Sequence, residues 1–95
     1  MKAYKYLQRG WCQGAVARDV AGEEVPAGSP EAVAWCLTGA LQRAYGFYNL
    51  TDKLAESLAK VEARLRGVGG SASEWNDAPD RTQGEVVALL WELNL

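Results

Sequence analysis

Four polar side chains are the candidates for chemistry in this chain, and they come from two separate segments. Asn76, Asp77 and Arg81 lie close together in sequence, and Asp19 occurs much earlier, next to Arg18. Carboxylate and guanidinium groups brought together could bind an anion or a sugar, or position a water for hydrolysis. The alternative is structural, because Asn and Asp also cap helix ends and shape turns. We favour the structural role, since a carboxylate with no histidine beside it is a weak indication of catalysis.

Both cysteines of the chain follow a tryptophan, in segments that resemble each other, Trp11–Ala15 and Trp35–Ala40. A functional interpretation pairs Cys12 and Cys36 as a redox couple or a disulfide. We favour two small buried side chains beside large aromatic ones, because the sequence offers neither thiol a neighbour that would stabilise a thiolate. Gly39 follows within a predicted helix, where glycine costs about 1 kcal/mol relative to alanine. It therefore indicates that another stretch of backbone approaches closely.

Composition disfavours several classes of protein. The chain has no histidine, and its two cysteines cannot supply the four ligands of a zinc site. No glycine-rich phosphate loop or nucleophile motif occurs, so we expect no cofactor and no metal, and an enzyme is the less favoured interpretation. Ten basic and twelve acidic residues give a net charge of −2, which argues against direct nucleic-acid binding.

A charged helix face and one tryptophan are the candidates for binding a partner. Lys53, Glu56, Lys60 and Arg64 alternate in charge at helical spacing. Such a face is usually only solvated, with small gains from ion pairs. Trp91 falls outside the apolar stripe of the last predicted helix, and an exposed aromatic side chain indicates a partner surface. These five residues form the predicted partner-binding face.

The elements that position these side chains follow from hydrophobic periodicity and turn signals. Helices are predicted over 2–9, 30–45 and 51–66, after Ser71 as one turn, and after Thr82, with a β-hairpin over 14–26. Asp19 and Gly22 are expected to bracket the hairpin turn, and 47–50 and 68–70 to be connectors. The predicted fold is mainly α-helical with minor β structure, a compact domain of three to four helices with a small β-hairpin near 14–26.

Capping residues set the predicted helix boundaries. Ser29 can cap free backbone N–H groups and Pro30 suits the first helical turn, so they predict where the second helix begins. Thr51 is expected to cap the helix that begins there, and Ser71 and Thr82 each precede a Glu at the spacing of a capping box. Gly10 follows the first helix as a C-terminal stop.

The length of 95 residues predicts a single domain over 1–95, large enough to build one hydrophobic core without disulfides. No apolar run approaches the roughly 20 residues that a membrane span needs. The N-terminal segment lacks the apolar core of a signal peptide. We therefore expect a cytoplasmic protein with reduced cysteines and no membrane partner.

The motifs as a set resemble a known family. Gly10–Ala15, Ala32–Leu41 and Trp75–Asp77, with Asp19 and Arg81, are similar to those of a family of small bacterial and bacteriophage proteins described only as a domain of unknown function. The resemblance covers nearly the whole chain. It implies a stand-alone small domain, common in phage and prophage sequences, and it carries over no catalytic residues.

The expected function is a non-enzymatic interaction with another protein in the cytoplasm of a bacterial host cell. An inhibitor of a bacterial defence system, such as an anti-CRISPR protein, is one concrete form of that expectation, by analogy alone. Alternatively, the exposed aromatic side chains would form the contact of a homodimer. The alternative is a small-ligand-binding or hydrolytic enzyme that uses Asp19, Asn76, Asp77 and Arg81.

Overall fold

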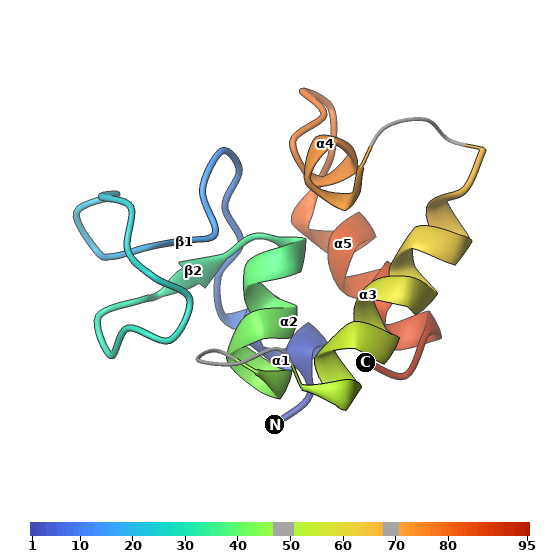
Figure 1. Ribbon diagram of the computed structural model, residues 1–95. Helices are drawn as coiled ribbons and strands as arrows, with labels where there is room; N and C mark the ends of the chain where they lie inside the picture. The colour runs from blue at the N-terminus through green and yellow to red at the C-terminus, as the bar shows by residue number, and fades with distance from the viewer. Residues whose placement is uncertain (47–50, 68–70) are drawn as a thin grey trace.

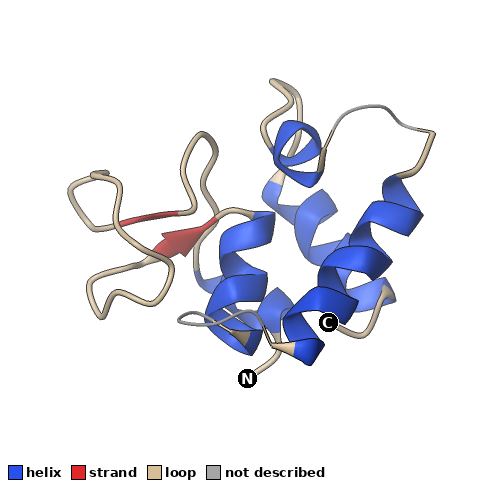
Figure 2. Ribbon diagram, viewed as in Figure 1, coloured by secondary structure: helices blue, strands red, loops and turns tan. Residues whose placement is uncertain are grey.

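The computed structural model describes residues 1–46, 51–67 and 71–95, and the connectors expected at 47–50 and 68–70 lie outside them. Within those ranges the chain forms five helices and one two-stranded antiparallel sheet (Figures 1 and 2). The elements are α1 (Ala3–Arg9), β1 (Ala17–Arg18), β2 (Ala34–Trp35), α2 (Leu37–Tyr45), α3 (Asp52–Leu65), α4 (Ala72–Asn76) and α5 (Gln83–Glu92). The predicted fold class, mainly α with minor β structure, is confirmed.

The core lies between the helices. The first helix, α1, packs against both α2 and α5, and α3 packs against α2. Large aliphatic side chains from four elements are fully buried there, among them Leu7, Leu41, Val61 and Leu90. The sheet and its loops lie to one side of α2, and α3, α4 and α5 lie to the other (Figure 1).

Three helices begin at the caps that the sequence predicts. The Thr51 hydroxyl accepts the Leu54 backbone N–H at the start of α3. The capping boxes that begin with Ser71 and Thr82 have both of their hydrogen bonds, at the starts of α4 and α5. Each cap satisfies backbone donors that the first helical turn leaves free.

The predicted start of the second helix at Pro30 is wrong, because α2 begins at Leu37. Ser29 does accept the Glu31 backbone N–H, but only a short turn follows. Residues 34–35 form β2 instead, with hydrogen-bonded neighbours on both sides. Pairing with distant segments thus overrides a local helix signal, as tertiary contacts commonly do.

The β structure expected near 14–26 is present and extends further than the sequence indicated. The Gly22 backbone N–H donates to Asp19 O at 2.9 Å, which closes the expected turn, and Val25 N donates to Ala17 O at 3.1 Å. The two-stranded sheet, however, is formed by β1 and β2, with Ala17 opposite Trp35. β2 therefore brings the hairpin onto the N-terminus of α2.

Two glycines allow backbones to meet closely, as predicted for Gly39. A Cβ atom on Gly39 would lie 1.9 Å from Val16 O, and one on Gly10 would lie 2.1 Å from Val33 O. No side chain fits at such distances without movement of the backbone. Gly10 does follow α1 as expected, but its backbone is extended, so close packing explains this glycine better than a helix stop does.

Candidate functional site

The side chain of Asn76, at the C-terminal end of α4, is fully buried and uses all of its hydrogen-bonding capacity. Its Oδ1 accepts the Trp11 indole N–H at 2.8 Å and the Leu37 backbone N–H at 3.1 Å. Its Nδ2 donates to Cys12 O at 3.1 Å and to the Asp77 carboxylate at 2.9 Å. An amide offers two lone pairs and two donors, and all four are occupied. We call these five residues the Asn76 junction.

The Asn76 junction caps a helix that lies far away in sequence. Leu37 is the first residue of α2, and its free N–H is satisfied by Asn76. Another free donor of the first turn, Gly39 N, donates to Cys36 Sγ at 3.3 Å. Sequence reasoning predicted a capping role for Asn76, but the helix that it caps could only be found from the fold.

Asp77 and Gln13 hold the loop after α1 against α4. Asp77 is exposed, and its Oδ1 also accepts the Gly14 backbone N–H at 3.1 Å. Gln13 Nε2 donates to the backbone carbonyls of Asn76 and Ala78 at 3.0 and 2.9 Å. The polar atoms around Asn76 thus serve to join chain segments.

The other two predicted polar residues lie elsewhere. Asp19 Oδ1 accepts the backbone N–H groups of Ala21 and Glu23, so it stabilises the hairpin turn. That turn lies within the β1–β2 connection, on the far side of the molecule from α4 (Figure 1). Of the four candidates, the structure brings only Asn76 and Asp77 into contact.

Arg81 is held by three contacts of its own. Its Nε donates to Trp75 O at 2.9 Å, and its guanidinium lies 4.0 Å from the centre of the Trp75 ring. Its Nη1 pairs with the Glu85 carboxylate at 3.0 Å. The pKa of Glu85 is lowered, chiefly because the backbone N–H of Thr82 donates to its carboxylate. The contacts around Arg81 therefore tie the start of α5 to the end of α4.

Both cysteines are free and buried, as the favoured interpretation expected. Burial raises the pKa of Cys12 to about 11, and the proximity of Cys36 adds to that rise. Burial also raises the pKa of Cys36. Cys36 is not in mid-helix as expected, since it is the N-cap residue of α2. A small hollow of about 200 Å³ reaches it, and its lining is Gly14, Ala15, Val16, Cys36, Ser73 and Asp77.

The residues of the predicted partner-binding face lie on two helices. Lys53, Glu56 and Lys60 are exposed on α3, and Lys53 Nζ lies 5.3 Å from the centre of the Tyr45 ring. Arg64 pairs with Glu92 of α5 at 3.3 Å, with both side chains about half exposed. Trp91 of α5 is 65% exposed. Arg64 is thus the member of this face that connects α3 to α5.

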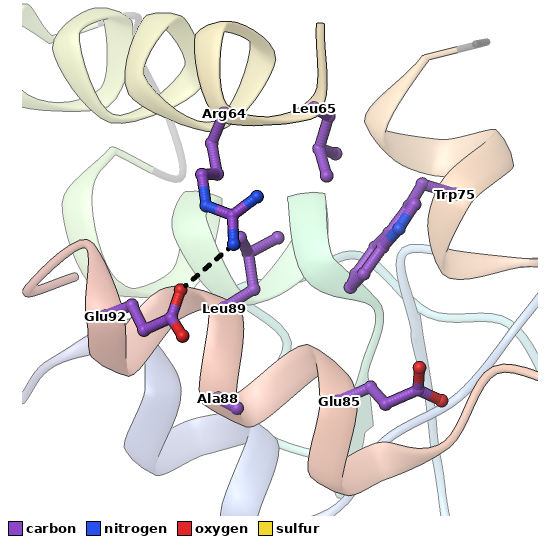
Figure 3. Close-up of a pocket in the computed structure, with 7 residues that line it drawn as sticks. All are labelled: Arg64, Leu65, Trp75, Glu85, Ala88, Leu89 and Glu92. Atoms are coloured by element: carbon purple, nitrogen blue, oxygen red, sulfur yellow. Dashed lines mark hydrogen bonds and ion pairs between the residues drawn. The ribbon is translucent and has the colours of Figure 1, made fainter. Parts of the chain in front are cut away.

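A groove between α3, α4 and α5 adds residues that sequence reasoning missed. Its volume is about 370 Å³, and its lining is Arg64, Leu65, Trp75, Glu85, Ala88, Leu89 and Glu92. We call it the α3–α5 groove. In Figure 3, Trp75 forms one side of it and the Arg64–Glu92 pair the other, with Leu89 between them. No sequence signal indicates this groove, because it depends on how the three helices are spaced.

Two further features are absent from the part of the chain that the structure describes. No group of three or more His, Cys, Asp or Glu side chains in residues 1–46, 51–67 and 71–95 is arranged to hold a metal ion. No helix in the same ranges is long and apolar enough to cross a membrane.

The fold and the site together define a small, mainly α-helical domain with a two-stranded sheet and an open interhelical groove. A model of a family of unknown function, DUF6197, matches residues 1–93, and the chain therefore belongs to that family. The expected membership of a family with no assigned function is confirmed. No curated protein and no solved structure matches the chain.

Proposed function

We propose that this domain binds another protein, and that the contact is made by the α3–α5 groove together with Trp91. The groove supports this role because its floor and one side are apolar, formed by Leu65, Trp75 and Leu89. A concave apolar surface with an aromatic side is the usual setting for the anchor residue of a protein partner.

The charges around the groove favour one kind of partner segment. Two carboxylates line the groove, and each is paired, Glu85 with Arg81 and Glu92 with Arg64. Glu92 is half exposed, and the structure gives it only the Arg64 contact, through one of its two oxygens. The proposed occupant is therefore an aliphatic or aromatic side chain of another protein, flanked by a basic residue that approaches Glu92.

Trp91 lies on α5, the helix that supplies four of the lining residues, but it is not part of the lining. Helical spacing places it one turn after Ala88, an exposed residue that lines the groove. Tryptophan is among the residue types that contribute most to the binding free energy of an interface. Its exposure of 65% is the observation that carries the proposal.

The biological setting is part of the same proposal. We place the domain in a bacterial cell, encoded by a phage or prophage, on the resemblance of its motifs to phage proteins. Inhibition of a defence complex, as by an anti-CRISPR protein, would use such a surface to cover the site of an effector. The enzymatic alternative has less support, because Asp19 and Asn76 already accept backbone N–H groups.

Affinity capture from a bacterial lysate, with matched variants, tests the proposed surface. Ala88→Arg places a long charged side chain in the groove, Trp91→Ala removes the tryptophan, and Glu92→Lys reverses the charge at its edge. Glu62→Lys is the matched control, because Glu62 is exposed on the flank of α3 away from Arg64. We expect a partner that wild type and Glu62→Lys capture and that the other three variants lose.

Two other results would assign the contact to a different surface or a different partner. Loss of the partner only in a Lys53→Glu, Lys60→Glu double variant would move the contact to the outer face of α3 and overturn the groove. Light scattering on the purified protein tests self-association, and a dimer that Trp91→Ala dissociates would replace the foreign partner with a second copy. Circular dichroism of every variant shows that each remains folded.

A further inference from the structure

The segment that follows α1 runs parallel to β2 and brings the two cysteines into register. Trp35 N donates to Gly10 O, and Cys12 N donates to Trp35 O, both at 3.1 Å. This pattern pairs Trp11 with Trp35 in a parallel bridge. The next pair in the same register is Cys12 and Cys36. Paired residues of parallel strands point to the same side, so the two thiols share one face.

The spacing suits a covalent bond between the two sulfurs. Neighbouring strands lie about 4.8 Å apart, and a disulfide joins Cα atoms that are roughly 4.4 to 6.8 Å apart. Cys12 and Cys36 are 9% and 6% exposed, so both thiols are buried. The influence of Cys36 on the ionisation of Cys12 independently indicates that the thiols are close.

A small reagent has a route to one of the two thiols. The hollow of about 200 Å³ has Cys36 in its lining, and Cys12 is not part of that lining. Because Cys36 lines this hollow and Cys12 does not, we expect Cys36 to react first and Cys12 to act as the resolving thiol.

We propose that Cys12 and Cys36 are a modification site, at which a small-molecule disulfide converts the two thiols to a reversible intramolecular disulfide. The Cys36 thiolate attacks one sulfur of the reagent, forms a mixed disulfide and releases the first reagent thiolate. The Cys12 thiolate then attacks Cys36 Sγ and releases the second. Each released thiolate takes up the proton that a cysteine lost, so one disulfide and two thiols react to give one disulfide and two thiols.

The bond would join the segment after α1 to the first turn of α2 and close the loop of residues 12–36, which contains the sheet. This loop lies outside the α3–α5 groove, so the inference does not depend on the proposed function. Closing a loop of this length restricts the unfolded chain, and we expect Tm to rise by roughly 5–15 °C.

Oxidised 2-mercaptoethanol is a suitable probe, because it is a small uncharged disulfide. The native protein is incubated with it, quenched in acid and analysed by intact mass and by thiol titration after denaturation. We expect a monomer that has lost two hydrogen atoms and both thiols, and that regains both on reduction. The rate should rise about tenfold per pH unit between about pH 7 and pH 9, because only thiolates react and burial raises the pKa of the Cys36 thiol above its ordinary value.

Two variants assign the order of the steps. Cys12→Ala should accumulate the mixed disulfide on Cys36, whereas Cys36→Ser should react far more slowly while remaining folded, since a serine hydroxyl also accepts the Gly39 N–H. Either of two results would overturn the proposal in the wild type. One is a mixed disulfide that persists beside a free Cys12 thiol, and the other is reaction only after denaturation or only between molecules.

Discussion

The Asn76 junction and the α3–α5 groove both place polar side chains next to a tryptophan, but with opposite results. In the junction the Trp11 N–H and the Asn76 amide satisfy each other in the interior. In the groove, Trp75 keeps a side toward solvent, and the surrounding charges form exposed pairs. Buried and fully hydrogen-bonded polar groups fix a structure, whereas half-exposed pairs contribute little to it and remain free to exchange partners. The polar residues most prominent in the sequence therefore maintain the fold, and those available for contact surround an apolar groove.

Replacement of Asn76 tests the first half of this comparison and should have the largest effect. Asn76→Ala leaves the Trp11 indole N–H, the Leu37 N–H and the Cys12 carbonyl without partners in the interior. We expect a loss of about 3–5 kcal/mol in the free energy of unfolding, measured by urea denaturation. Ser73→Ala, at an exposed position of the same helix, is the control and should stay within about 0.5 kcal/mol. A loss below about 1 kcal/mol in Asn76→Ala would mean that water replaces the amide.

Replacing glycine with alanine should change the free energy of unfolding in opposite directions at two positions, one near the Asn76 junction and one on α5. Gly39→Ala places a methyl group 1.9 Å from Val16 O, so we expect a loss of about 2–3 kcal/mol in unfolding free energy. Gly84→Ala on α5 meets no atom within 4 Å and should stabilise the protein by about 0.5–1 kcal/mol. Thermal unfolding of both variants measures the contrast. Equal effects of the two substitutions would contradict the close backbone contact at Gly39.

Alkaline pH should weaken the region of the Asn76 junction through its thiols. The pKa of Cys12 is raised from 9.0 to about 11 on folding, so the unfolded chain loses this proton more readily than the folded one. The contribution of this thiol is complete below about pH 9 and is lost as the pH rises toward 11. Urea denaturation across this range should show a smaller loss of stability in Cys12→Ala than in wild type. Identical profiles would indicate that the Cys12 thiolate is accommodated without penalty.

Removal of the ion pair at the groove should have the smallest effect. Arg64→Ala breaks the pair with Glu92, in which both side chains are about half exposed. Exposed pairs of this kind contribute little, so we expect a change below about 0.5 kcal/mol in unfolding free energy. The same variant in high salt is the control, since salt already screens such a pair. A loss above about 1 kcal/mol would show that the pair holds α3 to α5 and that the groove is less open to a partner.

The sequence predicts the features of this fold that depend on near neighbours. The caps at Thr51, Ser71 and Thr82 were predictable because each bonds a residue three positions away. The false helix start at Pro30 follows the same local logic, and it fails because residues 34–35 pair with distant segments. Gly39 is instructive, since a residue that is locally unfavourable correctly indicated a distant contact.

The same distinction between local and distant contacts applies to the candidate site. A capping role for Asn76 was predictable from its residue type, but its bond to Leu37 crosses 39 positions and required the fold. The exposure of Trp91 was predictable from the helical stripe. Trp75 could not be assigned to a groove, because its neighbours Leu65 and Leu89 come from helices on either side of it in the sequence.

The packing of α1 against α5 has a consequence for how the protein emerges from the ribosome. The backbone N–H of Ala3 donates to Leu95 O at 2.6 Å, so α1, which is synthesised before α2, α3 and α4, pairs with a segment that is synthesised after all of them. Until α5 leaves the exit tunnel, α2 can cover one side of α1, but the side that packs against α5 stays uncovered. The nascent chain must therefore carry an unfinished interior until residues 83–95 have been made.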